Sequence, residues 1–159
     1  DAHGLTILPH IAGERSPGWN GSARGAIMGL SFATNKAHIV RGVQEAVALR
    51  LGLVFERLEG ALPGVDKIVA SGGALLTSTG WLQIVADVIG RPITASMEEE
   101  ASSKGAAMMA FRSLGLVQSF EELPAALGKT YLPNMDNHQV YRRASQRQQQ
   151  LYARMHDHS

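Results

Sequence analysis

The sequence predicts an α/β fold whose sheet is incomplete. Two short apolar stretches, Lys67–Ala70 and Pro92–Ser96, have the length of buried strands, and a stretch with helical periodicity follows each of them. Short loops join these elements, which favours parallel pairing of the strands. A parallel strand normally needs neighbours on both sides, so two or three short strands cannot complete a sheet. We therefore expect chain outside these residues, or another molecule, to complete it.

The N-terminal part is expected to contain loops and one long helix. Residues 9–25 are rich in Gly, Pro, Ser and Asn, which favour turns, and Ala26–Phe32 is an apolar run of strand length. Thr34 or Asn35 offers an N-cap for a helix over residues 36–58, which Gly60 and Pro63 end. The chain opens without Met, which fits a fragment that starts within a fold and fits a processed terminus equally.

A compact alternating unit follows the long helix. Ser71–Gly73 is predicted to form a tight turn, and Thr79–Ile89 a helix that Gly90 closes in a left-handed conformation. A second helix is expected over residues 101–114. The three glutamates before it suit the positive end of the helix dipole, so a structural role accounts for them; they are Glu98, Glu99 and Glu100.

The sequence changes character after Leu116. Residues 120–127 are expected to form one short helix and residues 136–155 another, which carries four arginines: Arg142, Arg143, Arg147 and Arg154. The basic helix is interpreted either as a surface for nucleic acid or a protein partner, or as a solvated helix, and we favour the second. We divide the chain into a nucleotide-side portion, 1–117, and a C-terminal helical extension, 118–159.

Composition and missing motifs exclude several classes of protein. The net charge of +1 gives no reason to expect binding to nucleic acid or to an anionic membrane. There is no cysteine and no apolar run of about 18 residues, so we expect a soluble, cytoplasmic protein without disulfides. The sequence also lacks G-x-x-x-x-G-K-[ST], G-x-S-x-G and H-E-x-x-H, and we predict no metal site.

One candidate ligand site remains, the double glycine Gly72–Gly73 at the end of the first parallel strand. Open α/β sheets bind ligands at the carboxyl ends of their strands. Two glycines allow the backbone to approach a flat base or a phosphate without a Cβ atom in the way. A strand, two glycines and a helix form a weak signal alone, because turn geometry explains the pattern as often as function does.

Four blocks in one order resemble the FGGY family of carbohydrate kinases. S-G-G-A and W-L-Q-I-V-A-D-V-I-G-R-P-I, at Ser71–Ala74 and Trp81–Ile93, are similar to that family's nucleotide-binding segment. E-A-S-S-K-G-A-A at Glu100–Ala107 resembles its next block, and Gly13–Leu30 resembles an earlier loop and strand. The family's second signature is matched by Gly25, Ile27, Gly29, Leu30, His38, Ile39 and Glu45, although Gly42 and Gln44 depart from it.

The resemblance implies part of an actin-like ATPase (ribonuclease H-like) domain, from an enzyme that phosphorylates a sugar or sugar-acid hydroxyl with ATP and Mg²⁺. It places the nucleotide against Gly72, Gly73 and Ala74, with Thr77 or Ser78 as the adenine-contacting side chain. The G-E-R-S-P loop at 13–17 resembles that of gluconate- and xylulose-type members, of which we favour gluconate. Glu14, Arg15 and Arg24 either face the cleft or hold the loop by ion pairs.

The same resemblance implies that this chain carries no catalytic residue. The family's aspartate base and its sugar site lie in parts that this chain lacks, so we expect the chain alone to be inactive. We also leave a homo-oligomer open. The alternative from another class of function is a non-enzymatic interaction module that uses the basic C-terminal helix.

Overall fold

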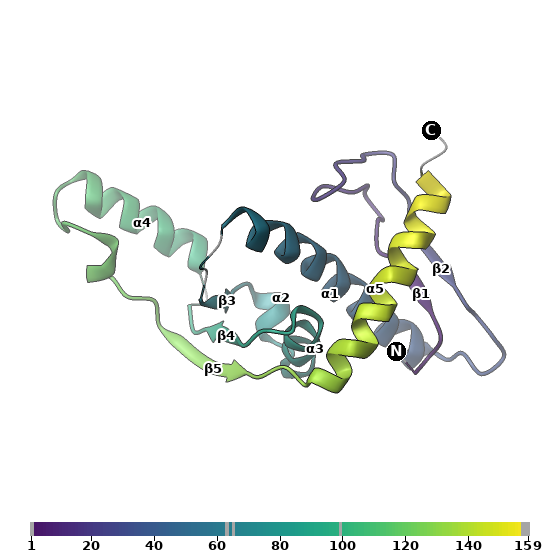
Figure 1. Ribbon diagram of the computed structural model, residues 1–159. Coiled ribbons are helices and arrows are strands. Elements are labelled where there is room, and N and C mark those ends of the chain that lie inside the picture. The colour runs from purple at the N-terminus through teal and green to yellow at the C-terminus, as the bar shows by residue number, and fades with distance from the viewer. Residues whose placement is uncertain (1, 63, 65, 99, 157–159) are drawn as a thin grey trace.

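The computed structural model describes residues 2–62, 64, 66–98 and 100–156 (Figure 1). The bounds of its strands and helices, in chain order, are β1 (Thr6–Leu8), β2 (Ala26–Met28), α1 (Lys36–Ala61), β3 (Ile68–Ala70), α2 (Gly73–Leu76), α3 (Thr79–Ile89), β4 (Ile93–Ser96), α4 (Ala101–Ser113), the 3₁₀ turn η1 (Phe120–Glu122), β5 (Leu127–Tyr131) and α5 (Met135–His156).

The strands form two small sheets. β1 and β2 pair antiparallel, with Ile7 opposite Ile27. The second sheet has the order β3-β4-β5; β3 and β4 are parallel, whereas β5 runs antiparallel to β4. The predicted α/β class, the parallel pair and the incomplete sheet are therefore confirmed.

Helix α1 begins where the sequence predicts. The Asn35 side chain accepts hydrogen bonds from the backbone N–H groups of Ala37 (2.9 Å) and His38 (3.1 Å), which satisfies donors that have no partner within the helix. The helix ends at Ala61, three residues later than predicted, because Gly60 does not interrupt its hydrogen bonds and the N–H of Leu62 still bonds to Leu58. Pro63, the other expected terminator, lies outside the described residues, as do Glu99 and the last three residues.

Helix α3 connects α1 to the larger sheet. Ser78 caps its first turn by accepting from the Trp81 N–H, and Gly90 closes it with φ 72° in the left-handed region, as predicted. The indole N–H of Trp81 donates to the Gln44 carbonyl of α1 at 3.0 Å. The buried core surrounds this junction and contains Ala48, Leu49, Ala70, Leu82, Ile84, Val85, Ala86, Ile93, Tyr131, Tyr141 and Ala144.

The prediction of a short helix over residues 120–127 is wrong. Ser119 and Glu122 form a capping box that begins a 3₁₀ turn, but Pro124 cannot donate the next backbone hydrogen bond and disfavours helical geometry at Leu123. The chain then pairs with the free edge of β4 as strand β5, with Tyr131 opposite Ile93. Tertiary pairing thus decides the conformation of this segment.

Helix α5 packs into the fold along one face, and its basic face is solvated, as expected. Tyr141, Ala144, Gln148 and Leu151 are buried along one face, at helical spacing. The four arginines named above stay exposed on its other side. The apolar run predicted as a strand over 26–32 is also shorter than expected, because Gly29 leaves the strand with φ 91°.

Glycine at position 52 allows α1 and α3 to pack closely. A Cβ atom at Gly52 would lie 2.7 Å from Cγ1 of Val88, a β-branched side chain that is stiff in a helix. Gly60, in the same helix, has open space around its Cα.

We predict opposite effects of alanine at these two glycines. Gly60→Ala should raise the free energy of unfolding by up to about 1 kcal/mol through helix propensity. Gly52→Ala should lower it by about 1–2 kcal/mol, because overpacking outweighs that gain. Urea unfolding followed by circular dichroism measures both. Equal stabilisation by the two variants would contradict the close packing of α1 on α3.

Candidate functional site

The carboxyl ends of β3 and β4 lie at the same edge of the larger sheet. The two strands pair in parallel, with Ala70 opposite Ala95, so the residues that follow them emerge side by side. Ser71 and Gly72 follow β3, and Met97 and Glu98 follow β4. Ligands of open α/β sheets bind at such an edge.

Gly72 and Gly73 differ in what their backbone requires. Gly72 has φ 103° and ψ 131°, a conformation that residues with a side chain rarely adopt, so turn geometry accounts for this glycine. Gly73 begins α2, its φ is not in the positive region, and a Cβ atom there would meet no heavy atom within 4 Å. The fold of this chain therefore gives no reason for glycine at position 73, which leaves close approach of a ligand as an explanation.

The other predicted site residues lie on α2 and at its end. The sequence placed the turn at 71–73, but Gly73 and Ala74 belong to this one-turn helix. Ala74 and Thr77 are exposed, and the Thr77 hydroxyl donates to the Ala74 carbonyl at 3.2 Å. Its oxygen can still accept a hydrogen bond from a ligand. The assignment of these four residues to nucleotide binding stays a prediction.

An open groove of about 430 Å³ begins at this edge, within the size range of small-molecule sites. One side is formed by the strand ends and α4, and the other by the segment around η1. Most of its lining is apolar, with polar groups from two serines, a glutamate and a lysine. The lining residues are Val69, Ser71, Ser96, Glu98, Ala101, Lys104, Gly105, Met108, Phe120, Leu123, Pro124 and Ala125.

Glu98 is held by specific partners in the groove. Its Oε1 accepts from the Lys104 ammonium at 2.5 Å and from the Ala126 N–H at 2.9 Å. These hydrogen bonds from Lys104 and Ala126 favour the charged form and lower the pKa of the Glu98 carboxyl. A structural role was expected for the glutamates at the start of α4, and for Glu98 it consists of bonds to Lys104 and to the segment before β5. Glu100 precedes α4 and makes no side-chain cap.

The G-E-R-S-P loop is anchored by a buried ion pair. Glu14 is 6% exposed, pairs with Arg50 of α1, and accepts from the Tyr152 hydroxyl (2.5 Å) and the Gly18 N–H (3.3 Å). Of the two alternatives for this loop, the ion pair is therefore correct for Glu14. Arg15 is exposed, and Arg24 donates to the carbonyls of Gly21 (3.3 Å) and Ala23 (2.9 Å) within its own loop.

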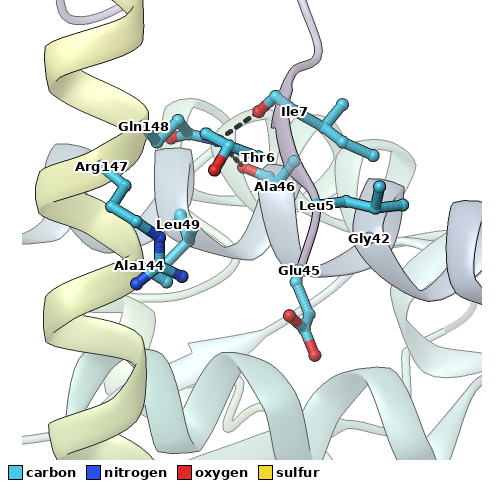
Figure 2. A pocket seen from close by; sticks show the side chains of 10 residues that line it. All are labelled: Leu5, Thr6, Ile7, Gly42, Glu45, Ala46, Leu49, Ala144, Arg147 and Gln148. Atoms are coloured by element: carbon cyan, nitrogen blue, oxygen red, sulfur yellow. Dashed lines mark hydrogen bonds between the residues drawn. The ribbon is translucent and has the colours of Figure 1, made fainter. Parts of the chain in front are cut away.

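The pocket between β1, α1 and α5 is a packing junction (Figure 2). Its cavity is about 10 Å³, close to the size of one water molecule, which is too small for a substrate. Across it the Gln148 amide donates to the carbonyls of Ile7 (2.9 Å) and Ala46 (3.1 Å), as the dashed lines show. Gln148 therefore connects α5 to β1 and to α1.

Two negative findings concern the part of the chain that the structure describes. No group of three or more His, Asp or Glu side chains gathers there in a way that could hold a metal ion. None of its helices is both long and apolar enough to cross a membrane.

Residues 1–114 match the C-terminal domain of the FGGY family of carbohydrate kinases. This chain belongs to that family. The gluconokinase of Bacillus subtilis (strain 168) is 33% identical over 142 residues, which make up 87% of this chain and 28% of that protein. The xylulose kinase of the same organism is 31% identical over 144 residues, 89% of this chain and 29% of the relative.

Solved structures confirm the fold. Gluconate kinase from Lactobacillus acidophilus superposes with a TM-score of 0.82 at 28% identity, over 94% of this chain and 31% of that one. The fold is therefore the actin-like ATPase type that the resemblance implied. The chain spans less than a third of the length of these FGGY relatives. The division at residues 117 and 118 stays a prediction.

Sequence reasoning missed one side of the groove. Ala101, Lys104 and Gly105 belong to the block at Glu100–Ala107 that resembled the family, but nothing in the sequence placed Phe120 beside the strand ends. Phe120 reaches the groove because β5 pairs with β4, and a local pattern that reads as a helix hides that pairing.

Proposed function

We propose that this chain is the ATP-binding C-terminal portion of a carbohydrate kinase that acts on gluconate or a related sugar acid, and that it has no activity alone. One observation carries the proposal: a groove of ligand size opens at the carboxyl ends of β3 and β4, and its lining includes Ser71, two residues before the exposed Gly73. In a member of the FGGY family, this edge is the place where a nucleotide is expected.

We place the nucleotide base in the groove and the phosphates toward α2, which begins two residues after the groove residue Ser71. Apolar side chains such as Met108 and Phe120 offer surfaces for a flat heterocycle, while Ser71 and Ser96 offer hydroxyl groups for its polar edge. Gly72, Gly73 and Ala74 would contact the ligand through backbone, and Thr77 through its hydroxyl. Mg²⁺ accompanies ATP in this proposal on the strength of the resemblance.

In the proposed reaction, this chain binds ATP and positions it. ATP supplies the γ-phosphoryl group, which passes to the hydroxyl of the sugar acid while a carboxylate accepts the hydroxyl proton. Among the described residues that line the groove, Glu98 is the one carboxylate, and Lys104 holds it. Asp87 is buried and accepts from Gln83 and Asn134. We therefore assign the base to the part of the kinase that this chain lacks.

The choice of gluconate as the acceptor rests on the G-E-R-S-P loop. It goes further than the assignment of the chain to the family. Glu14 holds the loop through Arg50 and Tyr152, so its shape belongs to the fold and does not require a ligand. The related proteins include kinases named for gluconate, xylulose and glycerol, so the acceptor has to be measured. A cytoplasmic location is part of the same proposal.

We predict that Gly73→Val weakens nucleotide binding by the kinase that contains this chain, without unfolding it. A Cβ atom at position 73 meets no heavy atom within 4 Å, so we expect the fold to accept valine there. The branched side chain would occupy the surface where the ligand is proposed to contact the backbone. Titration calorimetry with ADP should show a loss of affinity of about tenfold or more. Gly60→Val, also in open space on a helix, is the control and should bind ADP as the wild type does. Equal affinity in both variants would sink the assignment of Gly73.

The kinase that contains this chain should release ADP from ATP only when an acceptor is present. A coupled assay with a panel of aldonic acids, ketoses and polyols measures this, and gluconate should give the highest kcat/KM. The same assay on the 159-residue chain alone should show no turnover. If no acceptor stimulates ADP release, the kinase proposal is wrong; if a ketose or polyol gives the highest value, the choice of gluconate is wrong.

A further inference from the structure

One side of the groove consists of a segment with little regular structure. This wall, residues 120–126, contains the 3₁₀ turn η1 and the loop that leads into β5. Phe120 is 44% exposed, so its ring is not fixed by a core. The wall follows α4, which extends away from the rest of the molecule in Figure 1 and has no buried residue among those described. Burial of apolar surface therefore does little to fix the wall.

Polar contacts connect this wall to the opposite side of the groove. The Ala126 N–H donates to Glu98 Oε1 at 2.9 Å, and the Ala126 carbonyl accepts from the Met97 N–H at the same distance. The Lys104 ammonium donates to the Pro124 carbonyl at 3.2 Å and to Glu98 at 2.5 Å. Two side chains, one from the end of β4 and one from α4, thus reach the wall and each other.

Glu98 itself is oriented by its own backbone. Its N–H donates to the hydroxyl of Ser96, which is the last residue of β4 and is 8% exposed. The carboxylate is therefore placed by a buried strand end and not by a mobile loop. Oε1 of Glu98 bonds to both Lys104 and Ala126. Removal of the charge of Glu98, or of the charge of Lys104, therefore weakens the contacts that hold the wall.

We infer that Glu98 and Lys104 form a clip that holds the wall at the distance from α4 that a nucleotide base requires, which makes them positioning residues for binding. The inference rests on the proposed function, since it concerns the affinity of the same groove. Both side chains are partly exposed, at 24% for Glu98 and 32% for Lys104. Ion pairs so exposed add little to global stability, so the clip should act on the groove more than on the fold.

The experiment compares four variants of this chain with the wild type. Glu98→Gln and Lys104→Met remove one charge each, and Lys104→Arg keeps the charge. Glu59→Gln breaks another partly exposed ion pair of equal length, between Glu59 and Arg91, as the matched control. Amide exchange followed by mass spectrometry reports on the wall, titration calorimetry with ADP reports on the groove, and thermal unfolding reports on the fold.

We expect the amides of the wall, Ala126 above all, to exchange about tenfold faster in Glu98→Gln and Lys104→Met, because a local opening becomes easier. ADP should bind about three- to tenfold more weakly to these two variants, since the binding-competent wall is populated less. Lys104→Arg should restore most of the affinity, the control should match the wild type in both measurements, and melting temperatures should differ little.

Unchanged exchange in both variants would overturn the inference, and so would faster exchange with unchanged ADP affinity. A large fall in melting temperature together with loss of rescue by Lys104→Arg would show a general structural role instead. If the wild-type chain alone binds no ADP, the same titration on the kinase that contains it decides the proposed function, because half of the phosphate site is expected outside these residues. The exchange measurement would then still decide whether the clip holds the wall.

Discussion

Parallel pairing of β3 with β4 is the constraint on which the rest of the site depends. Because both strands run in one direction, Ser71–Gly72 and Met97–Glu98 emerge at one edge, and the chain continues from there into α2 and α4. β5 then pairs with the other side of β4 and brings residues 120–126 across from α4. A shift of this register by one position would reverse which strand side chains point to each face, so Val69 and Ser96 would no longer line the groove.

The helices keep this small sheet in place. α3 lies against α1 closely enough that Gly52 has no room for a side chain, and α5 packs on α3 and on β1. Polar contacts at the same junctions, such as Trp81 with Gln44 and Gln148 with Ile7, satisfy groups that burial would otherwise leave without partners. The wall of the groove has few contacts of this kind, which is why an ion pair there can matter for a ligand.

Local signals in the sequence predicted α1 and α3 well, because caps at Asn35, Ser78 and Gly90 and a clear apolar face act within each helix. They failed at β5, where Ser119 and Glu122 resemble a helix start but the conformation depends on β4. They also could not show that Gln148 is buried, since its partners are the backbone of β1 and α1. The glycine turn was found from the sequence, whereas the wall facing it was not.

The most direct test of a nucleotide site at this edge is a titration of the ¹⁵N-labelled chain with ADP, followed by two-dimensional NMR. Our account predicts that shifts concentrate in Gly72, Gly73, Ala74 and Thr77 and in the groove residues of α4 and the wall. Shifts that concentrate instead on the exposed arginines of α5, or no shifts at millimolar ADP, would contradict it.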